Sequence, residues 1–121
     1  MQPDKSYPSP NGRYRLDIFS HEVRMSHWLD CPSLFDNNEG KYIFSTGQHW
    51  DASNVEWSDD SNVLKLDLRH YGQDYSQITI TLELNKGKVF IHSNNRTVGV
   101  GSLSSVGAEL SNTTEFRMLF F

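Results

Sequence analysis

Apolar and polar residues alternate along most of this chain. The alternation is clearest in residues 77–84, where every second position is apolar: Ile78, Ile80, Leu82 and Leu84. A period of two residues places successive side chains on opposite faces of a β-strand. By alternation or by composition, further strands are predicted at residues 13–19, 22–29, 41–45, 55–57, 62–71, 89–92 and 97–103.

Turn-forming residues separate these segments at short intervals. Gly, Pro, Asn, Asp and Ser cluster at residues 9–12, 36–40, 58–61 and 85–88, as is typical of hairpin connections. No helical period is sustained, so residues 104–110 are interpreted as a loop or one short helical turn. The apolar residues 116–121 are predicted to form a final strand.

These elements predict one all-β domain. Its expected architecture is an antiparallel β-sandwich or open barrel of about eight or nine short strands. Residues 1–12, which contain three prolines and a glycine, are expected to form an irregular lead-in. A length of 121 residues suits a single domain.

Composition narrows the class of protein. No segment approaches the roughly 20 apolar residues of a membrane span, and the N-terminus lacks the apolar stretch of a secretory signal, so the expected location is the cytoplasm. Cys31 is the single cysteine, so no internal disulfide can form, and an inert thiol is expected. A formal charge of −4 disfavours direct binding to nucleic acid.

The negative charge is concentrated in one segment. Residues 30–60 carry seven acidic residues against the single base Lys41, whereas residues 1–29 and 61–121 each have a formal charge of +1. Tyr42, Trp50 and Trp57 lie among these acids. Aromatic rings supply contact area at interfaces and carboxylates steer a basic partner, so the segment indicates protein binding.

The predicted partner-binding residues are taken from the second half of that segment: Trp50, Asp51, Glu56, Asp59 and Asp60. Trp50 is expected in a loop over residues 47–53, and Trp28 on the polar face of its strand. At least one of these two tryptophans is therefore expected to be partly exposed. Whether the carboxylates form one surface or several depends on where the turns lie.

The run Glu22-Val23-Arg24-Met25-Ser26-His27-Trp28 resembles the opening of small bacterial proteins associated with contact-dependent and other polymorphic toxin systems. The resemblance covers roughly the first quarter of the chain. It implies an immunity protein, a cytosolic inhibitor that binds one basic toxin domain, commonly a nuclease, and blocks it without a cofactor.

Enzymatic motifs are weak in this sequence. The five histidines show none of the close spacings of familiar zinc sites, so no metal site is predicted. On a strand, Asp67 and Arg69 share a face that His70 does not, which separates the one candidate acid–base group. Two alternatives stay open: a small-molecule-binding or enzymatic barrel with aromatic residues at its mouth, and a self-assembling module. The sequence does not fix the oligomeric state.

Overall fold

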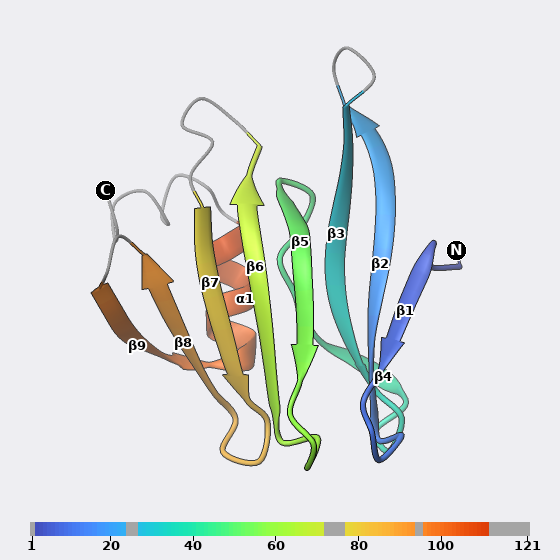
Figure 1. Cartoon of the computed structure of the whole chain (residues 1–121), viewed down its shortest axis with the longest axis vertical. Coiled ribbons are helices and arrows are strands. Elements are labelled where there is room, and N and C mark those ends of the chain that lie inside the picture. The colour runs from blue at the N-terminus through green and yellow to red at the C-terminus, as the bar shows by residue number, and fades with distance from the viewer. Residues whose placement is uncertain (1, 24–26, 72–76, 94–95, 112–121) are drawn as a thin grey trace.

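The chain folds into two antiparallel β-sheets and one helix (Figure 1). The computed structural model describes residues 2–23, 27–71, 77–93 and 96–111. Within these residues the strands are β1 Lys5–Pro8, β2 Tyr14–Val23, β3 His27–Asp36, β4 Lys41–Ser45, β5 Trp50–Trp57, β6 Val63–His70, β7 Gln77–Glu83, β8 Lys88–Ser93 and β9 Arg96–Ser102, followed by the helix α1 Leu103–Ser111.

Each sheet follows the chain order. The first sheet, sheet A, has the order β1-β2-β3-β4, and the second, sheet B, has the order β5-β6-β7-β8-β9. Within each sheet, every strand pairs antiparallel with the strand that follows it along the chain. The prediction of an all-β antiparallel fold is confirmed.

Alternation explains how the core forms. Leu64, Leu66 and Leu68 of β6 turn their side chains to one face of sheet B, and the same face carries Ile80 and Leu82 of β7. Sheet A contributes alternate residues of β2, together with Leu34 of β3 and Phe44 of β4, and α1 covers sheet B from behind in Figure 1. Most of the buried apolar side chains in the described residues form one cluster that draws on both sheets and the helix.

The helix α1 is longer than the loop or single turn predicted from the sequence. Of its described side chains, Val106 and Leu110, four residues apart, are fully buried, and two positions are too few to show a helical period. Gly107 lets the helix approach β4, since a Cβ atom there would lie 2.9 Å from the Ser45 carbonyl oxygen. The helix therefore packs directly against the backbone of sheet A.

Three other predictions need correction or fall outside the structure. The lead-in of residues 1–12 contains the strand β1, which completes sheet A beside β2. Residues 22–29 belong to two strands, because β2 ends at Val23 and β3 begins at His27. The strand predicted for residues 116–121 lies outside the described residues.

Candidate functional site

The five predicted partner-binding residues follow β5 from its beginning to the turn after its end. Trp50 and Asp51 open the strand, Glu56 lies near its end, and Asp59 and Asp60 occupy the turn to β6. A strand rises about 3.3 Å per residue, so β5 separates Asp51 from the turn that holds Asp59 by about 20 Å. The acidic segment is thus not one continuous patch.

Trp50 belongs to the core. The predicted loop over residues 47–53 is wrong in its second half, because β5 begins at Trp50. The Trp50 side chain is 0% exposed, and its indole N–H donates a 2.9 Å hydrogen bond to the Leu110 carbonyl oxygen. Trp50 therefore cannot serve as the surface anchor that the sequence suggested. Trp28, 58% exposed, confirms that one of the two tryptophans lies at the surface.

Asp51 joins the two sheets. Its Oδ1 accepts a 2.7 Å hydrogen bond from the Asp30 amide of β3, and its Oδ2 lies 3.7 Å from the Arg69 guanidinium of β6. Asp30 in turn lies 3.8 Å from the Lys5 ammonium. These carboxylates are already engaged within the fold, so they contribute less to the binding of a partner.

The acids in the turns have a different environment, because hydrogen bonds hold three turns together at one end of the molecule. The Asn11 amide donates to Ser61 Oγ at 2.9 Å, which links the β1–β2 turn to the β5–β6 turn. The Asn37 side chain donates to the Gly12 carbonyl oxygen at 2.8 Å, which links the β3–β4 turn. We call residues 9–13, 36–40 and 58–61 the turn platform.

Two carboxylates of the turn platform stabilise the turns themselves. Asp36 is 3% exposed, accepts hydrogen bonds from the Asn38 and Glu39 amides, and lies 3.5 Å from the Arg13 guanidinium. Asp60 accepts hydrogen bonds from the Ser58 hydroxyl at 2.6 Å and the Asn62 amide at 3.0 Å. These two bonds, the hydroxyl's first, lower the pKa of Asp60, which stays ionised and exposed.

The other two carboxylates of the turn platform have no bonding partner within the described residues. Glu39 and Asp59 are exposed, and within the described part of the chain their side chains make neither a hydrogen bond nor an ion pair. The turn platform carries four acids and only Arg13 as a base. Glu39 belongs to the acidic segment but is not among the predicted contact residues. The turn-forming residues 36–40 could have indicated it, because they place Glu39 in a turn, as residues 58–61 do for Asp59.

Aromatic side chains border the turn platform on the side of β1. The Trp57 indole N–H donates a 3.0 Å hydrogen bond to the Tyr7 carbonyl oxygen, and its ring stacks on Tyr14 with centroids 6.2 Å apart. Tyr7 is 38% exposed and Trp57 is half-buried. The acidic turns therefore adjoin rings that have contact area available.

The outer face of sheet B carries a shallow polar hollow. Its volume is about 380 Å³, and its lining comes from four strands: Asn54, Glu56, Lys65, Asp67, Thr79, Thr81 and His92. Asp67 accepts a 2.7 Å hydrogen bond from Thr79. Glu56 thus faces this hollow rather than the acidic turns. His70 lies on the opposite side, edge-on to Trp50 at 4.8 Å between centroids, as the strand pattern predicted.

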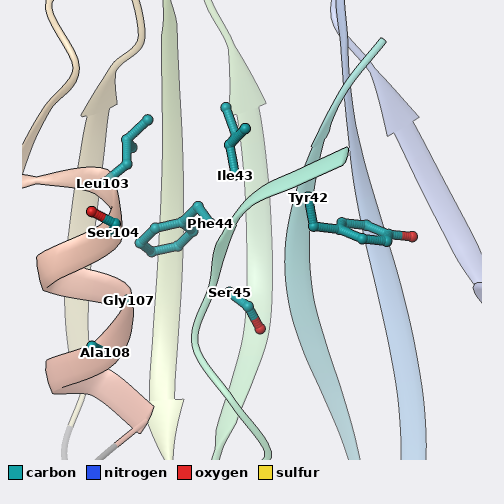
Figure 2. A pocket seen from close by; sticks show the side chains of 8 residues that line it. All are labelled: Tyr42, Ile43, Phe44, Ser45, Leu103, Ser104, Gly107 and Ala108. Carbon is teal, nitrogen blue, oxygen red and sulfur yellow. The ribbon is translucent and has the colours of Figure 1, made fainter. Parts of the chain in front are cut away.

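A second hollow lies between β4 and α1 (Figure 2). It has a volume of about 290 Å³ and is lined mainly by apolar side chains, among them Ile43, Phe44 and Leu103. Gly107 keeps the helix close to β4 at this point. The hollow offers no charged group for recognition, so it is a packing feature.

Cys31 is a buried cysteine of β3. The thiol is buried and free, and burial, followed by the nearby carboxylates of Asp51 and Asp30, raises its pKa to about 11. A thiol with so high a pKa is protonated at neutral pH, and His21 Nδ1 lies 3.7 Å from its Sγ. Among the described residues, no group of three or more His, Cys, Asp or Glu side chains is arranged to hold a metal ion.

Comparison with known proteins adds no family. No family model, curated protein or solved structure matches the chain. Over the residues that the structure describes, no helix has the length and apolar character needed to cross a membrane.

Proposed function

We propose that this protein is a cytoplasmic protein-binding inhibitor, an immunity protein that neutralises a basic toxin domain by occluding it. The turn platform carries the proposal, because it presents the free carboxylates of Glu39 and Asp59 on turns fixed by hydrogen bonds. Ordered loops lose little conformational entropy on binding, which favours affinity. No cofactor takes part in this mechanism.

The mechanism is electrostatic at first and steric afterwards. Exposed carboxylates attract Lys and Arg side chains of the partner and raise the rate of association, an effect that salt screens. Tyr7 and Trp57, which border the turns, then supply apolar contact area and exclude water. Blocking a toxin in this way requires tight binding and no turnover.

A capture experiment with matched baits tests the proposal. The double variant Glu39→Gln/Asp59→Asn removes two charges that have no partner within the fold. Glu22→Gln, near the far end of β2, removes an exposed charge away from the turn platform. A basic protein recovered by the wild-type and Glu22→Gln baits, but lost from the double variant at moderate salt, supports the proposal. Equal recovery by all three baits contradicts it.

The rescue of growth provides the functional readout. Co-expression with the captured protein should be tolerated with wild-type inhibitor and toxic with the double variant, provided that the captured protein is a toxin. A partner that is harmless when expressed alone contradicts the immunity role, even if it binds the acidic turns.

The polar hollow on sheet B supports a small-molecule-binding role as the second candidate. Lys65 and Glu56 lie opposite each other across β5 and β6, and neither makes an ion pair within the described residues. A ligand of mixed polarity would satisfy both groups. Chemical-shift changes confined to Thr79, Thr81 and their neighbours on addition of a metabolite mixture would favour this role over protein binding.

A further inference from the structure

The outer face of sheet A carries an ordered group of aromatic rings. The Tyr42 ring meets Phe35 edge-on at 5.0 Å and Phe19 edge-on at 6.0 Å between centroids. The Arg15 guanidinium lies over the Phe35 ring, 4.6 Å from its centroid. We call these four side chains, from β2, β3 and β4, the aromatic cluster.

The Asp17 carboxylate binds two side chains of the aromatic cluster, Arg15 and Tyr42. Its carboxylate is fully buried although it lies on the outer face of the sheet. It accepts hydrogen bonds from Arg15 at 2.6 and 2.9 Å, from Tyr42 at 2.7 Å and from Ser6 at 2.7 Å. Burial alone would raise the pKa of Asp17, but these donors outweigh it, and the pKa is lowered. The carboxylate is therefore ionised and cancels the charge of Arg15.

The result is a partly exposed, hydrogen-bonded and electrically neutral patch. Tyr42 is 44% exposed and the Arg15 side chain 36% exposed, while Phe19 and Phe35 are half-buried. Arg, Tyr and Phe are enriched at the centres of protein interfaces. A solvated sheet face normally carries separate polar side chains instead, as the outer face of sheet B does.

The charge of the patch indicates what covers it. The chain has a formal charge of −4, so two copies repel each other least when they meet at a neutral surface that keeps their acidic turns apart. A basic partner would be drawn instead to the acidic turn platform. An isologous contact also suits the chemistry, because Arg15 of one copy can stack on the exposed Tyr42 ring of the other, and the reverse, across a twofold axis.

We propose that the aromatic cluster pairs with the aromatic cluster of a second copy of this chain, forming a twofold-symmetric dimer through the outer faces of sheet A. This surface is separate from the turn platform, and the proposal does not depend on the identity of a toxin. Salt screens the repulsion between two negatively charged copies, so the dimer should persist or strengthen at higher salt, whereas the capture of a basic partner should weaken.

Sedimentation equilibrium of the purified full chain tests the dimer directly. The wild-type protein is expected to have twice the mass of one chain at about 100 µM, a range that detects a micromolar dissociation constant. Tyr42→Arg places a positive charge at the centre of the patch and should yield monomers. A monomeric wild-type protein at this concentration overturns the proposal.

Two further variants keep the test independent of folding. Ser45→Arg adds charge beside the cluster, next to Ser33 of β3, without removing a bond to Asp17. It should also yield monomers, with an unchanged circular dichroism spectrum. Tyr42→Phe keeps the ring and loses the hydroxyl, so the dimer should persist. A dimer that survives in both arginine variants shows that another surface joins the copies and overturns the assignment.

Discussion

The two ends of β5 carry similar residues in opposite environments. At its beginning, Trp50 is fully buried and Asp51 is bound by the Asp30 amide and Arg69. At its end, Trp57 is half-buried, and Asp59 in the following turn is exposed with no bond to the described residues. The beginning of the strand holds the sheets together, whereas its end presents charge to solvent.

This difference shows that composition alone does not identify a binding surface. A carboxylate with good donors has already exchanged its hydration for internal hydrogen bonds, so it has little further free energy to gain from a partner. An exposed carboxylate on an ordered turn keeps its full charge available. The comparison predicts opposite consequences for mutations at the two ends.

The largest expected effect comes from truncating the tryptophan at the beginning of β5. Trp50→Ala should lower the free energy of unfolding by about 4 kcal/mol, because it leaves a cavity and removes the hydrogen bond to Leu110. Trp28→Ala, at an exposed position, should change it by less than about 0.5 kcal/mol. Urea denaturation measures both. Similar losses of unfolding free energy in the two variants would contradict the assignment of Trp50 to the core and Trp28 to the surface.

The next effect concerns the most strongly bound carboxylate. Asp17→Asn should cost about 3 kcal/mol, since it leaves Arg15 and Tyr42 without their ionised acceptor. The pKa of Asp17 is lowered in the folded protein, so its contribution is fully present above the unfolded value of 3.8 and is lost as the pH falls through the folded value.

Urea titrations of wild type and Asp17→Asn at several pH values check this sign. The difference between their free energies of unfolding should be constant near neutral pH and shrink below about pH 4. A difference that grows on acidification would show that the carboxylate is not stabilised in its ionised form.

A smaller effect is expected at the start of β5. Asp51→Asn should lower the free energy of unfolding by about 1 to 2 kcal/mol, because it weakens the contacts to the Asp30 amide and Arg69. The matched change Asp59→Asn removes the same charge from the turn and should have almost no effect. Thermal denaturation followed by circular dichroism compares the two. Equal effects would mean that Asp51 is as free as Asp59.

The smallest effect on stability belongs to the turn platform. Glu39→Gln/Asp59→Asn should leave the free energy of unfolding within about 0.5 kcal/mol of wild type. With a captured basic partner, the same variant should associate several-fold more slowly and with a shallower dependence on salt. Surface plasmon resonance at two salt concentrations measures both quantities. An unchanged rate of association would remove the turn platform from the interface.

The period of two residues was enough to predict the fold class and most of the strands. It failed where the signal was short or depended on distant residues. Strand β1 has no alternating apolar residues and is held by pairing with β2. Among the described side chains of helix α1, Val106 and Leu110 are fully buried against sheets that the local pattern does not show. Trp50 looked like a loop residue, because the carbonyl oxygen that binds its indole N–H belongs to Leu110, 60 residues away.

The candidate site was partly predictable for the same reason. The turns containing Asp59, Asp60 and Glu39 are evident in the sequence, since Gly, Asn and Asp mark them. Their meeting at one end depends on the antiparallel order of the strands and on the hydrogen bonds of Asn11 and Asn37. The aromatic cluster was missed because Phe19, Phe35 and Tyr42 come from three strands and meet only through the register of sheet A.

The bond between the Asn11 amide and Ser61 also bears on when the acidic surface exists. These residues are 50 positions apart, and the hydroxyl is fully buried. Closing so long a loop is entropically costly, so this contact should form late, after both sheets are in place. An incompletely folded chain would then lack the assembled turns. A partner that recognises them would select finished molecules and, by mass action, protect them from unfolding.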